Sequence, residues 1–275
     1  MKKYSAPPTL LITSTTTTKL TFVKGSLHTI FPEAAKPNQT DLKTQRKRSN
    51  ETMTRRIIAL NNMGVRSLQC GYLEEAILSF RHAIEIMKTQ VVIPSPGIDS
   101  GSIDDMPLIR WSMIFFEEAQ VRDVSPHNIF DIFPCAFGLP RFPSASDVPH
   151  EISVVLLYNL ALAHHIAGLL GHEKNKDHLV QAYHHYKLCM AVFNSCTAES
   201  NFDLSFCSLL CGCCTNCGHI LSHLGRTKEA LSYGEYLSTL LESRPCTMYL
   251  SAEECEYFYT LTYSSKYACN AAPAA

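Results

Sequence analysis

The sequence predicts an all-α protein built from successive helical hairpins. Three segments align with one another on an asparagine, and each has a glycine nine residues after that asparagine. Apolar residues recur at helical spacing on both sides of the glycine, as they do in two helices joined by a short turn. Because one hairpin cannot bury its apolar face alone, a repeated unit indicates that neighbouring hairpins stack on each other.

Two further positions support the alignment. A small residue follows each asparagine by two positions and is expected to let the two helices of a hairpin approach closely, while the glycine is expected to end the first helix. In the second repeat a polar stretch, 171–177, lengthens the turn between the helices. The aligned residues are Asn62, Gly64 and Gly71 in the first repeat, Asn159, Ala161 and Gly168 in the second, and Asn216, Gly218 and Gly225 in the third.

This pattern resembles the tetratricopeptide repeat, a unit of about 34 residues that stacks helix pairs into a solenoid. The first repeat matches best, with Ala76, Phe80 and Ala83 in its second helix. The third departs most, with Gly234 where an aromatic residue is usual and Leu237 where alanine is usual. The resemblance implies a helix-hairpin solenoid that works as a scaffold for protein interactions.

The predicted boundaries follow from the repeats. A basic, Ser/Thr-rich disordered tail (1–50) precedes a helical domain (51–268), and a short disordered tail (269–275) ends the chain. The residues from Ser251 to Glu254 form a capping box, which predicts the start of a C-terminal helix that closes the stack. Within the domain we expect repeat 1 at 57–88, an insert at 89–150, repeat 2 at 152–194, repeat 3 at 205–243 and the capping helix at 251–267.

The insert fits no repeat but is rich in apolar residues, especially in 110–119 and 128–139. So much apolar surface argues against full disorder. We expect a partly structured insert, of two strands or a short helix, that lies on the solenoid. One hypothesis is that it occupies the domain's own groove and regulates access to it.

Charge and composition narrow the function classes. The net charge is −1, but residues 1–56 carry eleven Lys/Arg and three Asp/Glu, so the body of the chain is acidic and no nucleic-acid partner is predicted. No continuous apolar run approaches the ~18 residues of a membrane span, so no membrane partner is predicted. We expect a cytoplasmic protein. An N-terminal transit peptide to an organelle, or a nuclear signal at 43–48, are the alternatives.

The stretch 207–219, CSLLCGCCTNCGH, carries five cysteines and a histidine. Cys214 and Cys217 align with Leu60 and Met63 of the first repeat, which favours a role in packing. The alternative is a thiol-based redox or metal-handling protein that uses the Cys207–Cys217 cluster. Histidines are dense from 150 to 185, but neighbouring residues on a helix point about 100° apart, so a shared metal is not favoured.

Motifs for catalysis or nucleotide binding are absent from the sequence, and we predict a protein that is not an enzyme and has no catalytic residues, metal or cofactor. Its partner is an unknown protein or peptide. Asparagine side chains both donate and accept hydrogen bonds, so those on the first helices are suited to bind an extended peptide; the alternative is that they support packing between neighbouring repeats. Ile58 and Gly212 stand where a carboxylate-clamping member of the family would have lysine, so that ligand is not expected. The predicted peptide-binding groove comprises Asn61, Asn62, Tyr158, Asn159, Asn216 and His219.

Overall fold

The computed structural model of the chain describes residues 39–91, 112–115, 129–140, 149–170, 176–197, 206–242 and 247–270. The chain divides into two units, 1–42 and 43–275, and apart from the first four residues of α1 the features described below belong to the second. The described residues are mostly helical, as predicted, and they also contain one two-stranded sheet.

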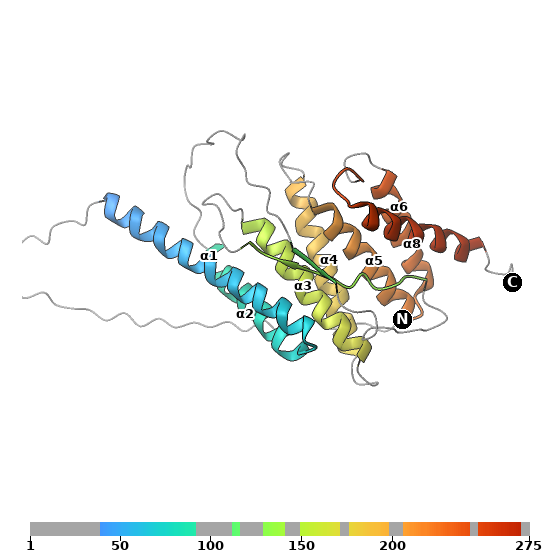
Figure 1. The fold of residues 1–275 in the computed structure, drawn as a ribbon, viewed down its shortest axis with the longest axis horizontal. Helices are drawn as coiled ribbons and strands as arrows, with labels where there is room; N and C mark the ends of the chain where they lie inside the picture. Colours follow the sequence, from blue (N-terminus) through green and yellow to red (C-terminus); the bar gives the residue numbers. More distant parts are fainter. Residues whose placement is uncertain are drawn as a thin grey trace, which may run out of the picture. The chain divides into compact units, whose positions relative to one another are not determined.

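The helices follow one another side by side in chain order (Figure 1). In space α2 contacts α3, α4 contacts α5, and α6 contacts α8, while α3–α4 and α5–α6 are the most extensive pairs. Their bounds are Gln39–Gln69 (α1), Leu73–Val91 (α2), Pro149–Leu170 (α3), Lys176–Thr197 (α4), Cys207–His223 (α5), Thr227–Glu242 (α6) and Ala252–Asn270 (α8).

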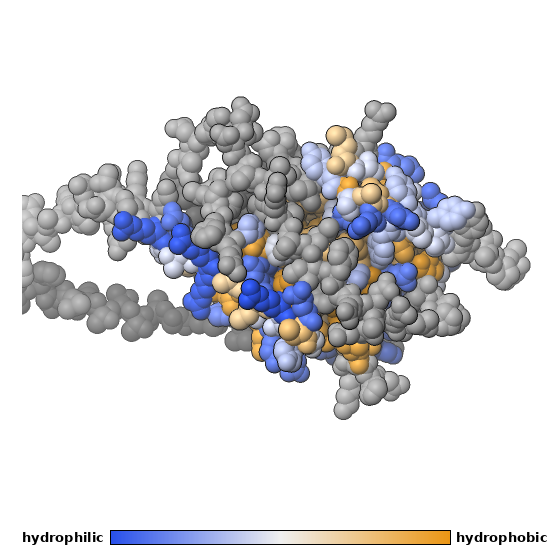
Figure 2. Space-filling model, viewed as in Figure 1, coloured by the Kyte–Doolittle hydropathy of each residue, from blue (hydrophilic) through white to orange (hydrophobic). Residues whose placement is uncertain are grey.

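Helix α1 begins at Gln39, inside the stretch 1–50 that was predicted to be disordered, and that boundary was wrong. From Gln39 onward the chain has no glycine or proline until Gly64, so nothing in its backbone interrupts a helix. On the face shown in Figure 2 this N-terminal part of α1 is hydrophilic. Residues 1–38 lie outside the described part of the chain, as do residues 271–275 of the predicted C-terminal tail.

Two of the three predicted turn glycines end their helices. Gly71 and Gly225 have φ of 78° and 73°, a left-handed conformation that glycine adopts without a steric penalty. After α1 the N–H of Gly71 donates to the carbonyl of Leu68, and the next N–H, of Tyr72, donates to Ser67. The same pair of hydrogen bonds closes α5 around Gly225. Both are Schellman motifs, which satisfy the last carbonyls of a helix.

The third glycine has another role. Gly168 lies inside α3, which continues to Leu170, so the prediction that it ends the helix was wrong. A Cβ at this position would lie 2.6 Å from the side chain of Leu179 on α4. Gly64 likewise faces Phe80 of α2, at 2.6 Å. These two glycines allow the helices of a hairpin to approach closely, which the alignment predicted for Gly64 only.

The predicted capping box is confirmed at the start of α8. The backbone N–H of Ser251 donates to Glu254 Oε2 at 2.8 Å, and the N–H of Glu254 donates to Ser251 Oγ at 3.1 Å. The second carboxylate oxygen of Glu254 also accepts from Ser208 Oγ on α5. The cap therefore fixes α8 to the last hairpin as well as starting the helix.

The insert contributes the sheet. Strand β1 (Ser112–Phe115) pairs with β2 (Cys135–Gly138) in antiparallel register, with Met113 opposite Phe137. All four residues of β2 are buried. Two strands were one of the two forms expected for the insert; its residues 92–111, 116–128 and 141–148 lie outside the described part of the chain.

One helix among the described residues is long and apolar enough to cross a membrane by length and composition. It is the stretch Glu151–Leu170 of α3, and 83% of its most apolar window is buried inside the structure. Polar residues such as Asn159 and His165 interrupt it, which is why no continuous apolar run was found in the sequence. In this fold α3 is the central core helix, between α2 and α4.

Candidate functional site

Four asparagines on the first helices of the hairpins contact one extended segment of the insert, residues 129–140. We call the surface formed by Asn61, Asn62, Asn159 and Asn216 the asparagine face. In Figure 1 the segment runs as β2 and an adjoining coil across α3 and α5. As the insert hypothesis expected, part of the insert lies on this surface.

Two asparagines each bind the backbone of one residue through both amide atoms. Asn159 Oδ1 accepts from the N–H of Phe137 at 2.9 Å, and its Nδ2 donates to the carbonyl of Phe137 at 2.8 Å. Asn216 holds Phe133 in the same way, at 2.7 and 3.2 Å. Both atoms of each side-chain amide are thus used on a single peptide residue, which fixes the position of the segment.

The first hairpin completes the series. Asn62 accepts from the N–H of Leu139 at 2.8 Å and donates to its carbonyl at 2.7 Å. Asn61 donates to the carbonyl of Phe137 at 3.1 Å. The three asparagines that align in the repeats therefore bind three residues of one segment, and the segment runs from the third hairpin toward the first.

The bound residues share one side of the extended segment. Phe133, Phe137 and Leu139 differ in position by four and by two. In an extended chain every second residue points its N–H and C=O groups the same way. Ala136 and Gly138 therefore direct these groups toward β1. Pro134, which has no N–H, stands at a position where the asparagine face requires none.

Three phenylalanines anchor the segment by their side chains. Phe130, Phe133 and Phe137 are each no more than 2% exposed. Phe133 packs against Phe258 of α8, with ring centroids 5.0 Å apart, and Phe137 meets Tyr158 of α3 edge-on at 5.0 Å. Burial of a phenylalanine side chain contributes roughly 1.5–3 kcal/mol, so the three rings are a large part of what holds the segment.

Glycines make room for two of these rings. A Cβ on Gly212 would lie 2.7 Å from the ring of Phe133. A Cβ on Gly218 would lie 2.8 Å from Phe130. A Cβ on Gly234 would lie 2.8 Å from Ser265 Oγ on α8 and 3.1 Å from Phe130. The prediction that Gly218 brings α5 and α6 together was wrong, because the side chain next to Gly218 is Phe130 of the insert segment. Gly212 and Gly234 were visible in the sequence only as departures from the repeat pattern.

The asparagines also connect neighbouring hairpins, which is the packing role that the sequence offered as the alternative interpretation. Asn159 Nδ2 donates to Asn61 Oδ1 at 2.9 Å, which links α3 to α1. Asn216 Nδ2 donates to the hydroxyl of Tyr186 on α4 at 2.9 Å. The face is thus held in place by the same groups that bind the segment.

The other two predicted groove residues, Tyr158 and His219, are buried beside the asparagines. Burial, followed by the nearby Tyr186, raises the pKa of Tyr158 well above its usual value. His219 Nδ1 lies 3.0 Å from Nε2 of His165 on α3. Burial, and then His219 itself, lowers the pKa of His165 well below 6.5, so this histidine stays neutral at neutral pH. All six predicted residues therefore lie together; four of them contact the segment by hydrogen bonds and Tyr158 by its ring.

The cysteines of 207–219 are core residues of α5. None of the five is more than 4% exposed. Burial raises the pKa of the Cys213 and Cys217 thiols well above the usual value, which disfavours the thiolate that redox and metal chemistry require. Within the described residues no three His, Cys, Asp or Glu side chains are placed to hold a metal ion.

We predict that the α5 thiols react with a thiol reagent only when the protein unfolds. Native protein treated with an aromatic disulfide and mapped by mass spectrometry should label Cys70, which is exposed, within minutes. Labelling of Cys211 and Cys214 should follow the unfolding rate and accelerate in urea. Rapid labelling of either in the native state would contradict the packing role.

Comparison with family models, with curated proteins and with solved structures finds no match for this chain. Its candidate site therefore rests on the geometry of the asparagine face.

Proposed function

We propose that the chain is a non-enzymatic protein-interaction scaffold, a tetratricopeptide-like solenoid whose asparagine face binds an extended peptide segment. The observation that supports this most directly is the paired hydrogen bonding of Asn62, Asn159 and Asn216 to the backbone of three residues in one segment. Backbone contacts of this kind accept many sequences, so side-chain pockets have to supply specificity.

The pockets indicate what sequence the face prefers. Phe130 and Phe133 lie over glycines of α5, and Phe137 lies against Tyr158. A favoured segment therefore has aromatic residues at the three positions that correspond to Phe130, Phe133 and Phe137. It also has an apolar residue two positions after the last of them. Its backbone is extended, and proline is accepted directly after the second aromatic residue, as at Pro134.

The occupant in this structure is the chain's own segment, so a partner's segment has to compete with it. A tethered segment acts at an effective concentration on the order of millimolar, which gives it a large advantage over a free peptide. Exchange therefore requires that the tether be cut or that the segment be released. This is the regulation that the insert hypothesis expects.

The test is an exchange experiment on the full chain with protease sites introduced in 116–128 and 141–148. After cleavage, a fluorescent peptide of residues 127–141 is added in excess and its uptake is followed by anisotropy and native mass spectrometry. We expect uptake by the cleaved protein and none by the uncleaved protein. A control peptide with Phe130, Phe133 and Phe137 replaced by serine should not enter.

A cleaved protein that keeps its original segment, and never takes up the labelled peptide under native conditions, would contradict the proposal. The segment would then be a permanent part of the core. Uptake of the serine peptide as well as the native one would instead show that the pockets do not select aromatic residues.

A further inference from the structure

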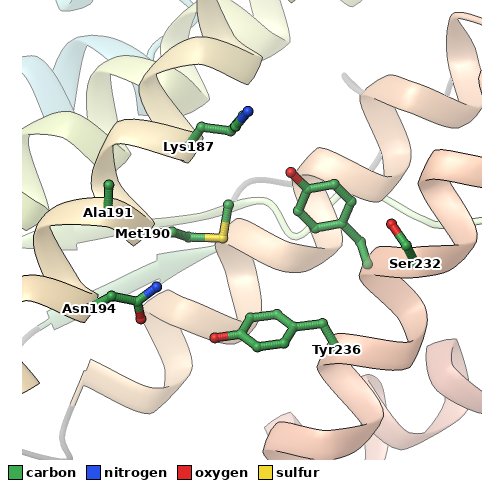
Figure 3. A pocket seen from close by; sticks show the side chains of 7 residues that line it. Lys187, Met190, Ala191, Asn194, Ser232 and Tyr236 are labelled. Atoms are coloured by element: carbon green, nitrogen blue, oxygen red, sulfur yellow. The ribbon is translucent and has the colours of Figure 1, made fainter.

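Open clefts lie between the second helices of the hairpins, away from the covered asparagine face. One, between α4 and α6, has a volume of about 350 Å³ and is lined by residues such as Met190 and Tyr236 (Figure 3). The ring of Tyr236 points from α6 toward Asn194 on α4. The other, between α2 and α4, has a volume of about 740 Å³ and is also lined by Leu157 and Leu160 of α3. The second cleft is the larger of the two, and Arg81, Glu85 and Lys88 give it charged groups.

Arg81 is held in a fixed orientation at the α2–α4 cleft. Its Nη2 donates to Gln181 Oε1 at 3.0 Å and lies 3.2 Å from His164 Nε2. Because a guanidinium has only donors, His164 Nε2 must accept this hydrogen bond. The proton of the neutral His164 ring is then on Nδ1, which lies 2.8 Å from His178 Nδ1 and donates to it.

A neutral His164 is what this arrangement requires, and its surroundings keep it neutral. Burial, followed by the charge of Arg81, lowers the pKa of His164 to about 3. His164 therefore orients Arg81 without adding a charge or competing for an anion. A guanidinium that is oriented in advance loses less freedom when it binds a carboxylate.

The charge of Arg81 is not balanced by an acid in the described part of the chain. Among the described residues that line the cleft, the only carboxylate is that of Glu85, which lies 2.7 Å from Lys88 Nζ. No described carboxylate forms an ion pair with Arg81, and its Nε and Nη1 make no hydrogen bond with the described residues. The donors on Nε and Nη1 therefore remain for an external acceptor, on two different edges of the guanidinium.

The rest of the cleft is apolar with histidines on one wall. Val180 and Leu188 of α4 are 57% and 42% exposed, and both line this cleft. His184 and His185 lie between them along the same helix. The apolar part of the lining is Ile84, Leu157, Leu160, Val180 and Leu188.

We propose that the α2–α4 cleft is a docking site for an acidic amphipathic peptide segment of another protein, with one carboxylate on Arg81 and apolar side chains against Val180 and Leu188. Charge complementarity selects the acid, since Arg81 is unbalanced. The apolar lining beside it selects a segment that also carries apolar side chains, because a lone anion would leave Val180 and Leu188 exposed to water. This site is separate from the asparagine face and does not depend on exchange there.

The test uses an acetylated and amidated peptide of repeated Glu-Leu-Ala-Glu units and a second peptide in which every Glu is replaced by Gln. Binding to the full chain is measured by calorimetry, and its location by the ring C–H signals of His184 and His185 in NMR spectra. We expect the acidic peptide to bind and to shift both histidines. Arg81→Gln should weaken binding roughly tenfold, the worth of a charge-assisted hydrogen-bonded pair. Arg66→Gln, which removes an exposed arginine of α1, should leave it unchanged.

A second variant separates loss of the site from loss of the fold. Val180→Glu places a negative charge, like those of the peptide, at an exposed position. It should weaken binding of the acidic peptide while leaving the thermal midpoint of unfolding within a few degrees of the native value. The proposal would be overturned if the acidic and glutamine peptides bind with equal affinity, or if Arg81→Gln binds as tightly as the native protein. It would also be overturned if the peptide binds without shifting the signals of His184 and His185.

Discussion

Replacing Asn159 with leucine is expected to destabilise the protein by about 3–5 kcal/mol. Leucine has the same branched skeleton of four side-chain heavy atoms as asparagine, so the change removes hydrogen bonds without opening a cavity. It leaves the N–H of Phe137 and Oδ1 of Asn61 buried without their partner. Each such group costs roughly 1–3 kcal/mol, because water cannot reach it to replace the lost bond.

The measurement is urea unfolding followed by circular dichroism. Asn50→Leu is the matched control, since Asn50 is exposed on α1, and it should change stability by no more than about 0.5 kcal/mol. A cost for Asn159→Leu as small as that of the control would mean that Asn159 does not bind the segment in solution.

Much of the helical fold could be predicted because its signals are local. The turn glycines Gly71 and Gly225, the close approach at Gly64 and the capping box at Ser251 each act within a few residues or within one hairpin. The start of α1 was missed for a related reason. Residues 39–50 contain one apolar residue, Leu42, and a helix without an apolar stripe resembles a disordered tail when judged by composition.

The asparagine face was predictable only in part. Alignment of the repeats placed Asn62, Asn159 and Asn216 on corresponding positions, and their chemistry indicated an extended peptide. What the sequence could not supply was the register of the segment, because Phe133 and Asn216 are 83 residues apart. No local periodicity encodes a contact at that separation.

The departures from the repeat pattern contained the missing information. Gly234 stands where the repeat usually has an aromatic residue, and Gly212 stands where a carboxylate-clamping repeat would have lysine. In the structure they lie where Phe130 and Phe133 need space. An irregular repeat is thus explained by what packs on it. We expect an inserted aromatic segment to pack wherever a helix of a repeat has glycine in place of a larger side chain at inward positions.

Phe130 and Gly218 provide the sharpest test of that packing. Phe130→Ala should cost about 3–5 kcal/mol, since the ring is buried and its removal leaves a cavity. Gly218→Ala alone puts a methyl group against the ring and should be destabilising, because overpacking costs about 1–3 kcal/mol and exceeds the ~1 kcal/mol gained in helix propensity. In the Phe130→Ala background the methyl group enters vacated space, so the same change should become stabilising.

The quantity that decides is the coupling energy between the two changes, expected to be about 1–3 kcal/mol from urea unfolding of the four proteins. Gly64→Ala serves as the control, because a Cβ there meets Phe80 and not Phe130. Its effect should add to that of Phe130→Ala within about 0.5 kcal/mol. If Phe130→Ala is too unstable to purify, Phe130→Leu reports the same change of sign with a smaller amplitude. Additive behaviour of Phe130 and Gly218 would mean that the ring does not lie on α5, and with it the segment would lose its place on the asparagine face.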